Sequence, residues 1–286
     1  MRQIIPLIIL LSIIFIYVLV SVTLETFVHD LQYRNEFLGR PWEAAKGQNP
    51  VTPLTPATAP RIAIFSFDTR APDAFKYIAL HNKNISDYAR AHNYTYVFKD
   101  ACDGARPHVH NAYWCKFTMI ADLLAAGYDY VLWLDTDTII RRPEIALAQI
   151  ARSYASDAFM AFDSPYHDRY LNAGVFIIRN SPAGRKILDE IITLYNTPAF
   201  QARCVEEDGS LRGKWAQSCY EQGVMNQVMR KHMPHVTILP RTLVHQYTNC
   251  KVPDTIFIQH LYATATGDRT QCFETFLRAA RDQRPA

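Results

Sequence analysis

Short apolar runs alternate along this chain with segments in which apolar residues recur at helical spacing. The apolar runs predict buried strands at 61–67, 94–98, 130–134, 157–162, 174–178, 236–239 and 257–260. The helical spacing predicts helices at 73–92, 114–126, 183–195 and 220–231. Residues 197–218 are polar and irregular, and predict a loop. The alternation indicates an α/β fold with a mainly parallel sheet in a single domain, whose ligands bind at the carboxyl ends of the strands.

One apolar run, Ile4–Val22, is much longer than a strand and carries no charge. Its length suits a membrane-spanning helix and exceeds the usual core of a cleaved signal peptide, which is the alternative. Arg2 precedes the run and acidic residues follow it, which favours a cytoplasmic amino terminus. Proline and threonine in the next segment keep a chain extended. We therefore expect a tail at 1–3, a signal-anchor at 4–22, a stem at 23–60 and a luminal globular domain at 61–286.

Cysteines and possible glycan attachment sites agree with a luminal domain. All 6 cysteines follow the apolar run, and an even number fits disulfides formed in an oxidising compartment. Proximity along the chain suggests the pairs Cys102–Cys115, Cys204–Cys219 and Cys250–Cys272, although many other pairings are open. Asn84 and Asn93 begin potential N-glycosylation sequences. The formal net charge is +3 with scattered basic residues, which argues against a nucleic-acid partner.

The clearest candidate chemistry is Asp135-Thr136-Asp137, which directly follows the apolar run at 130–134. On an extended segment, residues two apart point the same way, so both carboxylates could meet one cation. Carboxylate oxygens suit Mg²⁺ or Mn²⁺, which take further ligands from substrate phosphates. The pair therefore indicates a diphosphate-bearing substrate. The structural alternative is that both acids only open a turn.

Three further segments follow in order: Leu171–Asn180, Tyr220–Gln227 and a strand that ends at His260. With the acidic pair, they resemble the nucleotide-sugar glycosyltransferases of the GT-A type. The closest likeness is to the family of galactosyl-, xylosyl- and mannosyltransferases numbered 34, whose members are membrane-anchored Golgi enzymes. The resemblance covers about residues 61–269. It implies a GT-A domain in the Golgi lumen, with the endoplasmic reticulum as the alternative, and homo- or hetero-oligomers with other glycosyltransferases.

The resemblance implies a metal site formed by Asp135, Asp137 and His260. Asp137 would bind Mn²⁺ directly, while Asp135 would contact the metal or the ribose. A histidine beside two carboxylates shifts the preference from Mg²⁺ toward Mn²⁺, and Mg²⁺ stays the alternative. Without the resemblance, His260 would read as a partly buried histidine at a strand end.

The resemblance also implies residues that hold the donor. Asn172, Ala173 and Gly174 would line the sugar pocket, because Asn can donate and accept hydrogen bonds and Gly lets the backbone approach. A turn before a strand is the alternative. Lys116 and Arg269 would neutralise the leaving diphosphate. Near Arg269 the chain departs from the family pattern, with His260-Leu-Tyr-Ala-Thr-Ala-Thr-Gly-Asp-Arg269 in place of His-x-x-Gly-x-x-Lys. Phe65, Phe67 and Asp68 end the first strand, where they would hold the base.

Glu221 and Gln222 match an acidic-Gln pair beside the reacting carbon. The amide oxygen of Gln222 would support a developing positive charge, which implies a retaining front-face displacement. The structural alternative is that Glu221 only lies in the first turn of a helix, where its charge complements the helix dipole. Asp163 would bind an acceptor or donor hydroxyl, or initiate a turn before Pro165.

Three hypotheses follow from these residues. The first is a metal-dependent, retaining glycosyltransferase that moves a hexose or pentose from a nucleotide-diphosphate sugar, with a UDP-sugar favoured, to a glycan hydroxyl. The second is an inverting transferase with Glu221 or Asp163 as general base. The third is an inactive luminal sugar-binding protein. The sequence leaves open which sugar, acceptor and linkage are used.

Overall fold

The computed structural model describes residues 59–70, 75–102, 111–154, 156–164, 167–213, 217–246, 250, 254–262 and 266–282. The predicted tail, anchor and nearly all of the stem lie outside these ranges. Within them, no helix combines the length and the apolar character that crossing a bilayer requires. The prediction of an anchor at 4–22 therefore remains a prediction.

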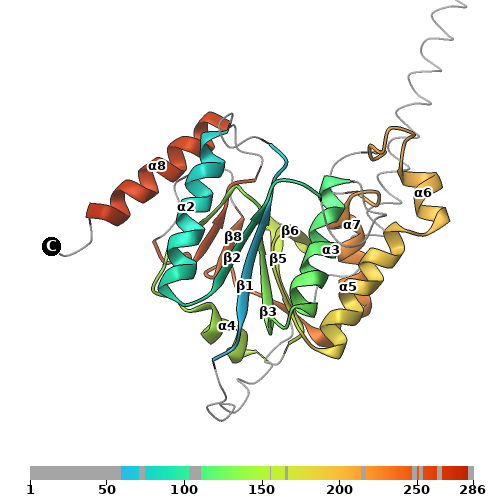
Figure 1. Cartoon of the computed structure of the whole chain (residues 1–286), viewed down its shortest axis with the longest axis horizontal. Coiled ribbons are helices and arrows are strands. Elements are labelled where there is room, and N and C mark those ends of the chain that lie inside the picture. Colours follow the sequence, from blue (N-terminus) through green and yellow to red (C-terminus); the bar gives the residue numbers. More distant parts are fainter. Residues whose placement is uncertain are drawn as a thin grey trace, which may run out of the picture. The chain divides into compact units, whose positions relative to one another are not determined.

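A central sheet forms the middle of the domain (Figure 1). Its 6 strands run in the order β2-β1-β3-β6-β5-β7. They comprise β1 (Ile62–Phe67), β2 (Thr95–Lys99), β3 (Tyr130–Leu134), β5 (Ala158–Ser164), β6 (His167–Arg179) and β7 (Val236–Ile238). All neighbouring pairs are parallel except those made by β6, which runs antiparallel to β3 and β5. The mainly parallel α/β prediction is confirmed, with β6 as the reversed strand among the described strands of this sheet.

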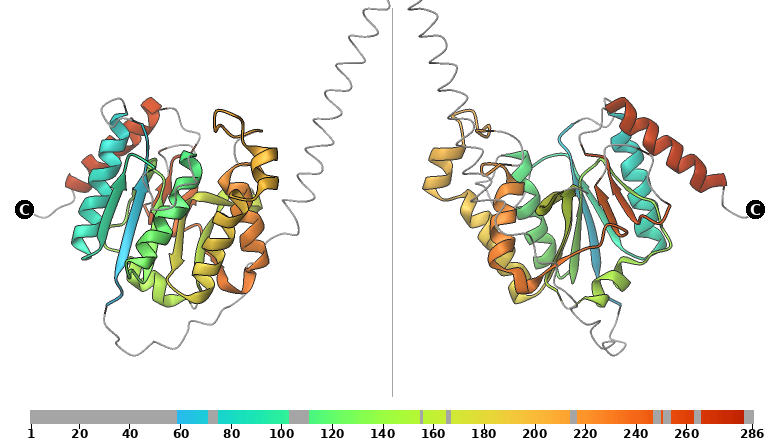
Figure 2. Two further views of the ribbon diagram at one scale, coloured as in Figure 1. Left: turned by 45° about the vertical axis from the view of Figure 1, so that its right-hand side comes forward. Right: turned by 180° about the vertical axis from the view of Figure 1, so that it is seen from behind.

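Helices cover both faces of this sheet (Figures 1 and 2). On one face lie α3 (Ala112–Ala125), α5 (Pro182–Tyr195), α6 (Pro198–Cys204) and α7 (Glu221–Lys231). On the other lie α2 (Lys76–Ala91), α4 (Leu147–Ser153) and α8 (Thr266–Asp282). Successive residues of β1 alternate between the faces: Ala63 and Phe65 join the first core, whereas Ile62 and Ile64 join the second. Because both faces are covered, β1 is apolar almost throughout and is buried.

A second, smaller sheet has 3 strands in the order β4-β9-β8. These are β4 (Thr138–Ile140), β8 (Val244–Gln246) and β9 (Ile258–His260). β4 pairs with β9 antiparallel, so that Thr138 lies opposite His260. The chain passes from β3 in the large sheet to β4 in the small sheet through Asp135-Thr136-Asp137. The two sheets therefore meet at the acidic pair.

Most elements that the sequence predicts are confirmed, within a few residues at their ends. The loop predicted at 197–218 contains the short helix α6, whose N-cap Thr197 accepts a hydrogen bond from the backbone of Phe200. All three predicted disulfides, Cys102–Cys115, Cys204–Cys219 and Cys250–Cys272, are present.

Asn84 is a poor glycan acceptor in the folded chain. Its side chain is buried, where Nδ2 donates to the carbonyl of Ile140 at 3.1 Å and Oδ1 accepts from the Ile140 N–H at 2.8 Å. A glycan on this nitrogen would break the link between α2 and β4. Asn93 is exposed, so of the two potential glycosylation sites only Asn93 agrees with luminal exposure of the folded chain.

Candidate active site

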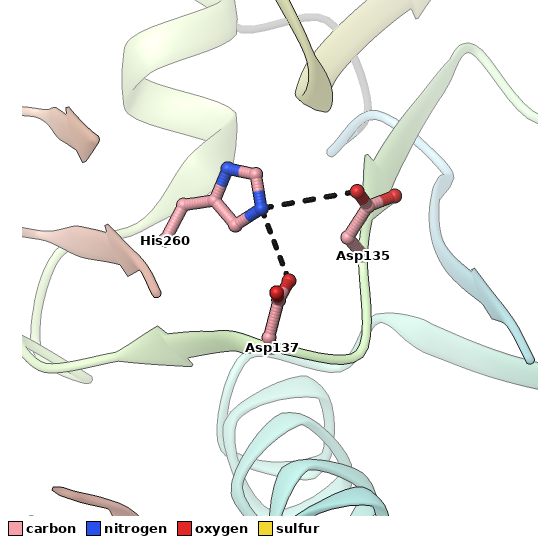
Figure 3. Close-up of side chains that lie close together, drawn as sticks. All are labelled: Asp135, Asp137 and His260. Carbon is pink, nitrogen blue, oxygen red and sulfur yellow. Dashed lines mark ion pairs between the residues drawn. The ribbon is translucent and has the colours of Figure 1, made fainter. Parts of the chain in front are cut away.

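Asp135, Asp137 and His260 come together where the two sheets meet (Figure 3). Their ligand atoms lie within 4.8 Å of one another. His260 Nε2 is 3.0 Å from Asp137 Oδ1 and 3.8 Å from Asp135 Oδ2. Two carboxylates and an imidazole that converge in this way fit a divalent cation such as Mn²⁺. The sequence prediction of this trio as one cluster is therefore supported by its geometry.

The acidic pair lies in a turn, and the prediction that it continues an extended strand is wrong. The Thr138 N–H donates to the carbonyl of Asp135 at 3.1 Å, and the Thr138 hydroxyl donates to the same oxygen at 2.8 Å. This turn redirects the chain from β3 to β4. The carboxylates meet because His260 approaches both of them, and not because a strand points them the same way.

Neighbouring side chains hold the outer oxygen of each carboxylate. The Trp133 indole donates to Asp135 Oδ1 at 2.9 Å, and Lys116 Nζ lies 3.8 Å from that oxygen. Arg269 Nη2 lies 3.1 Å from Asp137 Oδ2. Each carboxylate thus keeps its other oxygen toward His260. Groups of this kind orient metal ligands before the metal binds.

The charges in this cluster reinforce one another. Burial alone would raise the pKa of Asp137, but His260 and Arg269 lower it to about 2. Burial would lower the pKa of His260, but the nearby carboxylates, Asp137 above all, raise it. Asp137 is therefore ionised at neutral pH, as a metal ligand must be.

A buried histidine, His81, supports the turn that contains Asp135 and Asp137. His81 is fully buried; its Nδ1 lies 2.8 Å from the carbonyl of Thr138 and its Nε2 lies 2.9 Å from the Ser66 hydroxyl. The arrangement fits a neutral ring that donates from Nδ1 and accepts at Nε2. His81 on α2 thereby ties β1 to the residue that follows the acidic pair.

His81 should make the folded chain sensitive to acid. Burial lowers its pKa to about 4, whereas the unfolded chain has the ordinary value near 6.5. Between these values the unfolded state binds more protons, so stability falls as the pH drops from 6.5 to 4, by about 3 kcal/mol. Urea unfolding at pH 7 and pH 4 measures how much the free energy of unfolding decreases on acidification. In His81→Gln this decrease should be smaller than in the parent by about 3 kcal/mol. Equal losses in the parent and the variant would contradict this account.

A pocket of about 340 Å³ opens beside the cluster. Its walls include many residues that the sequence predicts for the site: Phe67, Asp68, Lys116, Asp135, Asp137, Asn172, Ala173, Gly174, Glu221 and Gln222. The prediction that Phe65 holds the base is wrong, because its ring is fully buried against Trp133 in the core. Asp163 also lies off this wall, where its Oδ1 accepts from Asn172 Nδ2 at 2.6 Å. Asp163 therefore positions Asn172.

Asn172, Ala173 and Gly174 lie within β6 and not in a turn before it. Pairing with β5 jumps from Phe176 opposite Met160 to Asn172 opposite Ala161, which is a β-bulge. Asn226 on α7 secures the bulge, since it accepts from the Leu171 N–H at 2.7 Å and donates to the Leu171 carbonyl at 2.8 Å. The bulge brings the backbone of Gly174 against His260, so closely that a Cβ would lie 2.2 Å from the imidazole Cε1.

Lys116, Glu221 and Gln222 form a buried polar group that contacts the backbone of Ala173. Lys116 Nζ lies 3.2 Å from Glu221 Oε1, and both side chains are about 5% exposed. Gln222 Oε1 accepts from the Ala173 N–H at 3.0 Å. The amide oxygen proposed to face the reacting carbon is therefore already bonded to the sugar-pocket segment. Within the described ranges, Gln222 Nε2 and Glu221 Oε2 are buried without a hydrogen-bond partner.

Sequence reasoning missed Arg70, which also lines the pocket. Its guanidinium donates to both oxygens of Asp68, at 2.8 Å from Nε and 2.6 Å from Nη2. Asp68 in turn accepts from the hydroxyl of Thr136, the middle residue of the acidic pair's turn. Asp68 thus supports the turn. The position of Arg70 just after the first strand was the available signal, since the ligand edge of an α/β sheet lies there.

Residues 62–153, from β1 through α4, match the galactosyl transferase GMA12/MNN10 family. The chain is similar to galactomannan galactosyltransferase 1 of Cyamopsis tetragonoloba, with 27% identity over 126 residues. That match covers 42% of this chain and 28% of the relative, so it concerns only part of the relative's length.

Two solved structures are similar to this chain at low sequence identity. One is a glycosyltransferase involved in the glycosylation of the major capsid of PBCV-1, with a TM-score of 0.56 and 14% identity. The match covers 76% of this chain and 100% of that one. Another is mouse xyloside xylosyltransferase 1, with a TM-score of 0.42, 10% identity, and coverage of 71% and 97%. The family match and the relative confirm the resemblance over part of the chain, and the capsid-related structure shows the shared fold.

Proposed function

We propose that this chain transfers a sugar from a nucleotide-diphosphate sugar, with a UDP-sugar favoured, to a hydroxyl of a glycan. The observation that carries the proposal is the cluster of Asp135, Asp137 and His260 at the edge of a pocket that Asn172 and Gln222 also line. A cation site beside a polar pocket suits a donor that carries both a diphosphate and a sugar.

A divalent metal, with Mn²⁺ preferred over Mg²⁺, would be held by one oxygen of each carboxylate and by His260 Nε2. When bound, it would neutralise the charge that grows on the leaving diphosphate. Arg70 and Arg269 add positive charge near this place, although each is partly offset by an aspartate. Lys116 is buried beside Glu221. We therefore propose that it orients the carboxylates of Glu221 and Asp135, and not that it neutralises the diphosphate.

We propose retention of configuration at the transferred sugar. The bond from the anomeric carbon to the diphosphate oxygen breaks, the acceptor oxygen bonds to the same face, and the acceptor's proton passes to the leaving phosphate. An inverting route needs a free carboxylate as general base. Glu221 is paired with Lys116, and Asp163 is bonded to Asn172, which supports the retaining alternative.

The first test is hydrolysis of donors by the purified 286-residue chain, across UDP- and GDP-sugars. We expect one donor to release nucleotide in the presence of Mn²⁺, and EDTA to reduce the rate at least about 100-fold, because a bound metal contributes several kcal/mol to such reactions. Excess Mn²⁺ should restore the rate. Nucleotide binding without turnover would favour an inactive sugar-binding protein.

The stereochemical proposal needs its own measurement. Proton NMR of the sugar released by donor hydrolysis, recorded before mutarotation, should show the same anomeric configuration as in the donor. The opposite anomer would establish the inverting alternative and would leave the transferase assignment intact.

We further propose that the protein is anchored in the Golgi membrane through residues 4–22, with this domain in the lumen. The three disulfides are in keeping with an oxidising compartment. Protease protection of the domain in sealed Golgi vesicles, lost on adding detergent, would support this topology.

A further inference from the structure

An exposed tyrosine stands at the pocket. Tyr113 is 44% exposed and lines the pocket wall, whereas Met233, which is 38% exposed, does not line it. These are the large apolar side chains exposed within the described ranges. Most of the chain's described aromatic residues are buried or half-buried, whereas Tyr113 offers an exposed ring at the pocket.

Tyr113 is paired with Tyr220. Their ring centroids are 5.3 Å apart at an interplanar angle of 67°, an edge-to-face contact. Tyr220 directly precedes Glu221 and Gln222, which line the same pocket. Tyr113 opens α3 one turn before Lys116. The pair thus lies where the starts of α3 and α7 border the polar group that contains Gln222.

The backbone beneath both rings is firmly held. Asn111 accepts a hydrogen bond from the Tyr113 N–H at 3.1 Å and donates to the carbonyl of Gly209 at 3.3 Å. Cys115, two residues after Tyr113, is disulfide-bonded to Cys102, and Cys219, one residue before Tyr220, is disulfide-bonded to Cys204. A ring on such a support loses little conformational entropy when a ligand covers it.

The walls of the pocket differ in character. Phe67, Asp68 and Arg70 come from the end of β1, beside the acidic turn, and form the wall where a nucleotide would be held. Tyr113 and Gln222 come from the starts of α3 and α7. The carbon–hydrogen face of a pyranose is apolar while its rim is hydroxylated, so an aromatic face beside polar groups suits a sugar ring.

We propose that Tyr113 and Tyr220 form the binding platform for the acceptor sugar, with a pyranose ring against Tyr113 and one of its hydroxyls directed toward Gln222. The platform rests on the proposed function, because it presupposes a donor in the adjoining pocket. It assigns the acceptor as a sugar rather than a protein side chain or a lipid alcohol.

The test separates acceptor binding from donor use. With saturating donor and Mn²⁺, transfer to methyl glycosides of glucose, galactose, mannose and xylose is measured together with hydrolysis of the same donor. Both routes share donor activation, so the ratio of transfer to hydrolysis at low acceptor concentration reports on the acceptor site. In Tyr113→Ala and Tyr220→Ala this ratio should fall about tenfold, the order expected for one lost ring contact. Tyr113→Phe should stay within about twofold of the parent, as should Met233→Ala, the matched control outside the pocket.

Several results would overturn the platform. A parent-like ratio in both alanine variants would do so. A fall in affinity for UDP or GDP without a change in the ratio would assign the rings to the nucleotide base. Donor hydrolysis by the parent without transfer to any of the glycosides would also reject a sugar platform while leaving the proposed use of a nucleotide-sugar donor standing. Absence of donor hydrolysis in the parent would instead reject the proposed function, and the platform with it.

Discussion

Replacing Asp137 by asparagine is expected to lower metal-dependent turnover at least about 100-fold, the largest effect that we predict for a substitution. Asp137 Oδ1 faces His260 Nε2 at 3.0 Å, and its Oδ2 faces Arg269 at 3.1 Å. Asparagine keeps the volume but removes the charge that both the cation and Arg269 require. Turnover measured across a range of Mn²⁺ concentrations should show weaker metal binding as well as a lower maximum.

Asp254→Asn is the matched control for this experiment. Asp254 also faces an arginine, with Arg141 Nη2 at 3.2 Å, but its side chain is exposed and lies away from the pocket. The same chemical change there should leave turnover within about twofold of the parent. If Asp137→Asn retained parental turnover and Mn²⁺ dependence, the assignment of the metal site would be wrong. Thermal unfolding of each variant distinguishes loss of the metal site from loss of the fold.

Replacing Gly174 by alanine is expected to weaken Mn²⁺ binding at least about tenfold, as is typical when the support of a metal ligand is removed. The added Cβ would lie 2.2 Å from Cε1 of His260 and 2.8 Å from both ring nitrogens. The ring is 2% exposed and has little room to retreat. It must therefore turn away from Asp137. Electron paramagnetic resonance of free Mn²⁺ in a titration measures the affinity directly.

A double-mutant cycle tests this cause of the Gly174 effect. His260→Ala alone should reduce Mn²⁺ affinity strongly, because it removes a ligand. In the His260→Ala background the imidazole is absent, so the methyl group of Gly174→Ala has space. The second substitution should then lower Mn²⁺ affinity by less than about threefold. A full additional loss in the His260→Ala background would show that the alanine acts through β6 itself and not through the imidazole.

Local sequence pattern was sufficient for the elements that carry the site. β1 and β3 are contiguous apolar runs, and α5 and α7 show helical spacing, so each could be predicted from neighbouring residues alone. The three disulfides join cysteines that are close in the chain, where short loops are the least costly to close. The order of the motifs was enough to indicate the family resemblance, part of which the match at residues 62–153 supports.

Placement of side chains could not be predicted in the same way. Phe65 and Phe67 share one strand face, yet only Phe67 reaches the pocket, since depth in the sheet depends on the neighbouring strands and helices. Lys116 was predicted to neutralise the leaving diphosphate, but the contact between the starts of α3 and α7 buries it against Glu221. Arg70 and Tyr113 reach the pocket through loops and helix starts, which have no periodic signature.

The sequence by itself therefore determined the α/β class and named the residues of the candidate cation site, because each depends on short patterns or on motif order. Proximity along the chain only suggested the disulfide pairs, which the structure then confirmed. Only the tertiary structure decided how these residues meet. The antiparallel pairing of β4 with β9 carries His260 to the acidic turn, and the bulge in β6 brings Gly174 against its ring. Such contacts arise from strand pairing between distant segments, and the register of that pairing is set by packing of the whole domain rather than by any local stretch of residues.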